Sequence, residues 1–163
     1  MNTFKLNNGF EIPVIGLGTF LAPKEECYNA CLWALKAGYR QIDTAQNYKN
    51  EEAVGKALKA SGVKREDVFI TSKLQISRYG KNNTKKAVLK SINDLGVDYI
   101  DLYLMHWPSQ SYEMNLETYH ALEEMVTEGY IRSIGVSNFQ IHHLEHLPVS
   151  YTHLRAHETR GNL

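Results

Sequence analysis

VFITSKLQISRYGKNNTKKAVLKSINDLGVDYIDLYLMH, residues 68–106, joins two short apolar runs through a longer segment of helical spacing. The runs at 68–73 and 99–106 are rich in the β-branched and aromatic residues that favour strands. The segment between them repeats apolar residues every three or four positions and stops at Gly96, as an amphipathic helix does. Residues 68–106 therefore predict one strand–helix–strand unit of a parallel α/β fold.

The same alternation recurs about five times along the chain. Further strands are predicted at 14–18, 40–43 and 131–136, and further helices have their apolar stripes at 27–35, 53–58 and 119–126. A fifth helix is expected to open at 137–140, SNFQ, which fits the capping-box pattern. Residues 4–12 contain Asn8-Gly9 between two short runs, which predicts an N-terminal β-hairpin acting as a lid or plug.

The composition is that of a soluble globular chain with no charge-driven partner. Its 163 residues include 18 Lys and Arg against 18 Asp and Glu, so nucleic acid or an anionic membrane is not expected as a partner. No apolar run approaches the roughly 18 residues of a membrane helix, and the start has no signal-peptide core, so a cytoplasmic location is expected. Cys27 and Cys31, four apart on a helical stripe, are expected to be core residues.

Polar residues close four of the predicted strands. Asp43, Lys73, His106 and Ser137 follow one another at intervals of about 30 residues, the length of one βα unit. Since parallel strands all end on the same side, these side chains are expected to meet at the carboxyl edge of the sheet, where such folds hold their active sites. The alternative is that each strand ends in a polar residue because it emerges into solvent.

The chemistry of these residues suits the reduction of a carbonyl group by a nicotinamide. Tyr48 follows Asp43 by five residues, and a phenol can donate a proton at neutral pH if a cation such as Lys73 stabilises its phenolate. His106 adds another hydrogen-bonding group, and Ser137 with Asn138 offers contacts suited to a carboxamide.

Five stretches together resemble the aldo-keto reductase superfamily: IPVIGLGTF (12–20), IDTAQNYKNE (42–51), TSKL (71–74), DLYLMHWP (101–108) and GVSNF (135–139). The resemblance extends to about residue 147 and is closest to bacterial enzymes of the 2,5-diketo-gluconate reductase type. It implies a (β/α)8 TIM barrel that binds NADPH without a Rossmann domain. In agreement, the glycine stretch that begins at Gly16 has Leu21 where the Rossmann fingerprint requires its third glycine.

The resemblance also implies a role for each matching residue. Tyr48 matches the general acid, Lys73 the cation that supports it, Asp43 the partner of Lys73, and His106 the residue that orients the substrate carbonyl. The implied cofactor contacts are Gly18, Thr19, Asp43, Ser137 and Asn138. Phe20 and Trp107 match aromatic walls of the substrate pocket, where His106 also binds the substrate; core packing of the two aromatics is the alternative.

Two other patterns do not lead to a function. His142 and His146 are spaced as metal ligands can be, with His143 between them, but HHLEH lacks the order of a zinc motif and no metal is expected. GVSNF lacks the last glycine of a nucleophile elbow, so a serine hydrolase is not expected either.

The length does not fit a whole barrel, which needs roughly 250 residues. Residues 1–148 are therefore predicted to be the N-terminal part of a truncated barrel. Residues 149–163 lack the family pattern, resemble translated sequencing-adapter DNA and are predicted to be a non-native tail.

The parent protein is expected to be a monomeric reductase of a small carbonyl substrate. This chain is expected to self-associate through open sheet edges, to bind NADPH weakly and to turn over no carbonyl substrate by itself. A non-catalytic NADPH-binding regulatory subunit of the same fold is the alternative function, and a phosphate-handling barrel enzyme is a second.

Overall fold

A five-stranded parallel sheet lies at the centre of the chain. The computed structural model describes residues 2–145 and 147. The strands are β3 (Leu17–Gly18), β4 (Gln41–Asp43), β5 (Phe69–Leu74), β6 (Ile100–Met105) and β7 (Ile131–Val136). They are hydrogen-bonded in the order β3-β4-β5-β6-β7, and every pair is parallel. Sequential order with one crossover helix between neighbours is the arrangement of a barrel wall, which confirms the predicted fold class.

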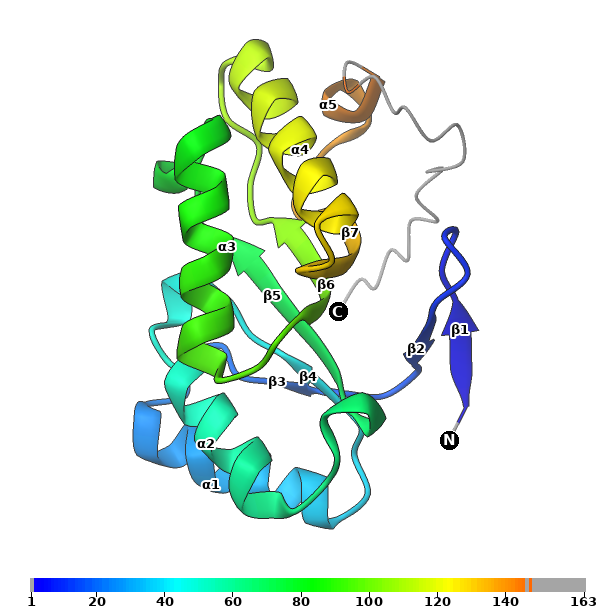
Figure 1. The fold of residues 1–163 in the computed structure, drawn as a ribbon, viewed down its shortest axis with the longest axis vertical. Coiled ribbons are helices and arrows are strands. Elements are labelled where there is room, and N and C mark those ends of the chain that lie inside the picture. The colour runs from blue at the N-terminus through cyan, green and yellow to red at the C-terminus, as the bar shows by residue number, and fades with distance from the viewer. Residues whose placement is uncertain (1, 146, 148–163) are drawn as a thin grey trace.

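Four long helices cover one face of this sheet (Figure 1). They are α1 (Lys24–Lys36), α2 (Glu51–Ser61), α3 (Lys81–Leu95) and α4 (Tyr112–Thr127), and a short helix, α5 (Ile141–Glu145), follows β7. The core lies between these helices and the strands, and its fully buried side chains include Ile70, Tyr103 and Leu122. Cys27 and Cys31 are free thiols buried in this layer, as predicted.

The predicted helix ends agree with the structure where glycine marks them. Gly62 and Gly96 directly follow α2 and α3 with φ angles of 74° and 63°. This left-handed conformation disfavours residues with a Cβ atom, so a glycine ends the helix there.

The N-terminal hairpin forms as predicted from β1 (Thr3–Lys5) and β2 (Glu11–Pro13). The Asn8 side-chain amide in its turn donates to the Arg132 carbonyl at 3.1 Å and to the Ser133 hydroxyl at 2.9 Å. Both acceptors lie near the amino end of β7, so the hairpin is a plug at the amino ends of the strands and does not cover the carboxyl edge.

Two boundaries differ from the sequence-based expectation. The first parallel strand covers only Leu17–Gly18, because the Val14 amide still pairs with the Asn2 carbonyl of the hairpin. The helix expected from the capping box at 137–140 begins instead at Ile141. Asn138 has a φ of 62°, which no α-helix accommodates, and its side chain donates to the Ser137 hydroxyl that was expected to cap the helix.

Some expectations fall on residues outside the described ranges. The boundary at 148, the predicted non-native tail at 149–163 and the contribution of His146 to a metal site are among them. Within residues 2–145 and 147, no three His, Cys, Asp or Glu side chains are grouped to hold a metal ion. No helix in the same ranges is long and apolar enough to cross a membrane.

Gly55 on α2 lies against the last residue of α3. A Cβ atom built there would overlap the Leu95 carbonyl oxygen. We expect Gly55→Ala to lower the free energy of unfolding by about 1–3 kcal/mol, because the backbone of α3 must move. Urea unfolding measures the change, and Lys56→Ala at an exposed position of the same helix is the control. Equal or higher stability of Gly55→Ala, as helix propensity alone would give, contradicts the prediction.

Candidate active site

The four strand-ending residues come together at the carboxyl edge of the sheet. Asp43 is the last residue of β4 and Lys73 the next to last of β5, while His106 and Ser137 directly follow β6 and β7. The backbone continues the ladder past the strands, since the amide of His106 bonds to Leu74 and that of Ser137 to Met105. One edge of one sheet therefore presents a carboxylate, an amine, an imidazole and a hydroxyl group.

A chain of polar contacts joins Asp43, Lys73 and Tyr48. The Lys73 ammonium group is buried and donates to the Asp43 carboxylate, to the Thr44 carbonyl at 3.1 Å and to the Tyr48 hydroxyl at 3.4 Å. Asp43 compensates the buried cation. The ammonium group is therefore fixed against the phenol oxygen, where it stabilises negative charge when the phenol gives up its proton.

The His106 ring is a further neighbour of the Tyr48 ring. The two ring centres are 5.8 Å apart and the rings are nearly perpendicular, at 76°. Burial lowers the pKa of His106, the nearby Lys73 cation lowers it further, and Asp43 opposes both effects. The imidazole is therefore neutral at neutral pH, and its buried Nδ1 atom has no hydrogen-bond partner among the described residues.

The lowered pKa of His106 can be tested by titration. In an NMR pH titration, His106 is expected to take up its proton below the ordinary pKa of 6.5. Because the folded chain binds this proton less tightly than the unfolded chain, the His106 contribution to stability falls as the pH drops through 6.5. Lys73→Met is expected to raise the pKa of His106, since it removes a neighbouring cation. An unchanged or lower pKa in Lys73→Met contradicts the assignment.

Tyr48 is held by the turn that carries it. This turn is the 3₁₀ helix η1 (Gln46–Tyr48), which follows β4. The Gln46 side-chain amide donates to the Ala87 carbonyl at 2.9 Å and to the Ser91 hydroxyl at 3.1 Å, and its oxygen accepts from the Gln75 amide at 3.2 Å. The turn is thereby tied to α3 and to the segment that follows Lys73.

Asn50 fixes the other end of the same turn. Its side chain is 1% exposed and donates to the carbonyls of Thr19 and Ala22, at 2.9 and 3.1 Å. Its oxygen accepts from the Thr44 hydroxyl at 3.0 Å. Sequence reasoning missed the roles of Gln46 and Asn50; the only signal was that three side-chain amides lie around the tyrosine within IDTAQNYKNE.

The residues predicted to contact the cofactor surround the same edge. A Cβ atom built on Gly18 would have no neighbour within 4 Å, so the space above that backbone is open. The Asn138 amide nitrogen donates to the His106 carbonyl at 2.8 Å and to the Ser137 hydroxyl at 3.1 Å, which leaves its oxygen as an acceptor. An open backbone and a fixed amide acceptor fit a flat carboxamide-bearing ring. Thr19 is buried, and its backbone amide and side-chain hydroxyl both donate to the Asp43 carbonyl. Its side chain therefore helps to fix the end of β4.

Phe20 and Trp107 flank the tyrosine and the histidine. The Phe20 ring centre is 5.1 Å from that of Tyr48, and the Trp107 ring is 6.4 Å from that of His106. Phe20 is 65% exposed and Trp107 52% exposed, which disagrees with the core-packing alternative. The two aromatics instead border the edge where the polar groups meet.

Comparison of the sequence with models of protein families identifies the kind of protein to which this site belongs. The sequence model of the Aldo/keto reductase family matches residues 14–160. The chain belongs to this family. The match continues past the boundary predicted at residue 148, which stays a prediction.

Two curated bacterial reductases resemble the chain over most of its length. It is 50% identical to the glyoxal reductase of Bacillus subtilis over 147 residues, which are 90% of this chain and 52% of that protein. It is 50% identical over 143 residues to the methylglyoxal reductase DkgA of Escherichia coli O157:H7, which are 88% of this chain and 51% of that protein. The chain thus spans about half the length of these relatives.

Solved aldo-keto reductase structures share the fold. MGS-M4, an aldo-keto reductase from a Medee basin deep-sea metagenome library, superposes with a TM-score of 0.87 at 50% identity. The aldo/keto reductase of Brucella melitensis gives 0.86 at 49% identity. The two matches cover 90% and 88% of this chain but 54% and 56% of the other chains. The matched part of this aldo-keto reductase chain therefore corresponds to about half of each of those chains.

Proposed function

We propose that this site reduces small aldehydes and ketones to alcohols with NADPH, and that Tyr48 is the general acid. The observation that carries the proposal is the contact of the buried Lys73 ammonium group with the Tyr48 hydroxyl, with Asp43 behind it and His106 beside it. This arrangement supplies a proton donor whose conjugate base is stabilised in place.

The proton and the developing charge are handled by three side chains. NADPH, when bound, supplies the hydride that reaches the carbonyl carbon. Tyr48 gives its hydroxyl proton to the carbonyl oxygen, and the phenolate that remains is stabilised by Lys73. Neutral His106 donates a hydrogen bond to the same oxygen, which orients the substrate and stabilises the charge that develops there. Tyr48 then regains its proton from solvent.

The residues around this centre fit the proposed ligands. Ser137 and Asn138 would hold the carboxamide of the nicotinamide, and the open backbone at Gly18 leaves room for its ring. Phe20 and Trp107 would form the walls of the substrate pocket. Small 2-oxoaldehydes are the proposed substrate class, because relatives at 50% identity are named glyoxal and methylglyoxal reductases. The Lys73–Tyr48 contact favours catalysis over a regulatory subunit, which would not require it.

Two further expectations belong to the same proposal. Free, buried Cys27 and Cys31 suit a reducing compartment, which supports a cytoplasmic location. Strands β3 and β7 are the edge strands of the described sheet, and an unpaired edge invites pairing with another chain. Self-association of this chain is therefore proposed.

A chimaera tests the proposed reaction. The aligned 147 residues of Bacillus subtilis glyoxal reductase would be replaced by those of this chain, so that the site is set in a full-length reductase. We expect consumption of NADPH with methylglyoxal, followed by absorbance. A folded chimaera that binds NADPH but turns over no aldehyde contradicts the proposal.

A further inference from the structure

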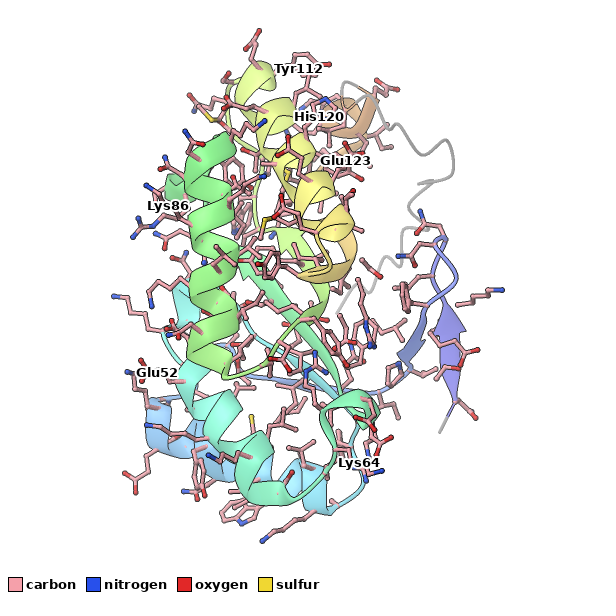
Figure 2. All side chains as sticks on the ribbon, viewed as in Figure 1. Glu52, Lys64, Lys86, Tyr112, His120 and Glu123 are labelled. Carbon is pink, nitrogen blue, oxygen red and sulfur yellow. The ribbon has the colours of Figure 1, made fainter. Side chains whose placement is uncertain are left out.

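A groove of about 350 Å³ lies beside the turn η1 that carries Tyr48. Its walls come from the starts of α1 and α2, from α3, from η1 and η3 (Ile76–Arg78), and from the residues next to these turns. Asp43, Tyr48, Lys73 and His106 do not line it. Helices α2 and α3 flank β5, which lies in the middle of the described sheet. The groove is therefore removed from the two outer strands, β3 and β7. Figure 2 shows Glu52 and Lys86, two of its lining residues, along the same side of the molecule.

Three of the cations that line this groove have no ion pair among the described residues. They are Lys49 in the loop after η1, Arg78 at the end of η3 and Lys86 on α3, and all three are exposed. No carboxylate of residues 2–145 and 147 lies within salt-bridge distance of them. Positive charge therefore accumulates there in a chain whose formal net charge is zero.

The carboxylates of the groove do not compensate this charge, because each is already engaged. Glu52 lies 3.7 Å from Lys24, and Asp94 lies 2.5 Å from Lys90. Glu51 is buried and accepts from the Ser72 hydroxyl at 2.7 Å. Burial also raises its pKa, which favours the neutral carboxyl group. The lining cations that no described carboxylate pairs are therefore Lys49, Arg78 and Lys86.

Hydrogen bonds hold two of the polar residues that line the groove. Gln46 lines it and is fixed by hydrogen bonds to α3 and to the Gln75 amide, while Asn83 donates to the Tyr79 carbonyl at 3.4 Å. A volume of about 350 Å³ is at the lower end of the range for small-molecule sites, and is too small for a folded segment. A guanidinium group binds phosphate oxygens through two parallel hydrogen bonds, and an ammonium group binds them as a point charge.

We propose that this groove binds a small anion with two or more phosphate groups, held by Lys49, Arg78 and Lys86. Several phosphates are needed to engage three cations that come from three separate elements of the chain. The binding is electrostatic, so it weakens as the salt concentration rises.

Calorimetry with inorganic tripolyphosphate on the whole chain tests this site. We expect saturable binding that the double variant Arg78→Gln/Lys86→Gln weakens tenfold or more. The double variant Lys59→Gln/Lys64→Gln removes the same charge outside the groove, and Figure 2 places Lys64 at the other end of the molecule from Lys86. This control is expected to change the affinity less than twofold. Equal losses in both variants, or no binding by the unaltered chain, overturn the proposal.

Further ligands identify the chemistry that is recognised. ATP that binds as well as tripolyphosphate, with AMP much weaker, supports recognition of the phosphate chain. Tighter binding of polyglutamate than of tripolyphosphate overturns the proposal in favour of an acidic polypeptide. In the unaltered chain, tripolyphosphate is expected to shift the NMR side-chain amide signals of Gln75 and Asn83. Shifts confined to residues outside the groove overturn the proposal even if the variants fail to fold.

Discussion

Tyr48→Phe is expected to lower kcat for methylglyoxal by about 10²–10⁴-fold in the full-length chimaera, the usual contribution of a positioned general acid. The substitution removes one oxygen atom and leaves the ring in its contacts with Phe20 and His106. The carbonyl oxygen then loses its proton donor, while the residues proposed to hold NADPH are unchanged. The dissociation constant of NADPH is therefore expected to change less than about twofold.

The comparison variant for this experiment is Tyr39→Phe. Tyr39 is partly exposed and lies between α1 and β4, away from the carboxyl edge of the sheet. The Tyr39→Phe variant is expected to leave both kcat for methylglyoxal and the dissociation constant of NADPH unchanged. If Tyr48→Phe retains full turnover, Tyr48 is not the acid and the proposed mechanism is wrong.

The carboxyl edge that holds the candidate site could be predicted from the sequence because it depends on spacing. Asp43, Lys73 and His106 are separated by one βα unit each, and parallel strands place their carboxyl ends together. Spacing says which residues share an edge, and the structure confirms that they do. The spacing does not give the contacts between the side chains of these residues. Tyr48 reaches Lys73 only because a 3₁₀ turn, closed by the bond from the Tyr48 amide to the Ala45 carbonyl, brings it back over the strand end.

The interactions that support this edge were not predictable in the same way. Gln46 and Asn50 act through hydrogen bonds to the backbone of segments that are distant in sequence, and no periodic pattern marks such partners. The capping-box prediction failed at Ser137 for a related reason. Its pattern is local, whereas the Asn138 side chain is held by the carbonyl of His106, which follows the neighbouring strand β6. Tertiary contacts outweighed the local preference there.

Asp101 is a further residue whose role the sequence concealed, since it lies inside an apolar run. It is 4% exposed, and one carboxylate oxygen accepts from the Arg65 guanidinium at 2.6 Å and from the Ile70 amide at 2.9 Å. The other oxygen accepts from Arg132 at 3.3 Å. Both guanidinium groups lie over the Tyr99 ring, 4.1 and 3.8 Å from its centre. One carboxylate thus links β5, β6 and β7 near their amino ends, where the hairpin packs.

Asp101→Ala is expected to lower the free energy of unfolding by about 3 kcal/mol, because it leaves Arg65 partly buried without its counter-charge. The buried Ile70 amide also loses its acceptor. Asp98→Ala, at an exposed position three residues away, should change stability by less than about 0.5 kcal/mol in the same urea titration.

A double-mutant cycle separates the charge effect from simple loss of packing. If the uncompensated Arg65 cation dominates, Arg65→Ala/Asp101→Ala will be less destabilised than the sum of the two single variants, with a coupling of about 1–3 kcal/mol. Additive effects, or a loss of less than about 1 kcal/mol in Asp101→Ala, contradict the assignment. Because Asp101 lies at the amino ends of the strands, its removal should lower stability without changing the pKa of His106 at the opposite edge.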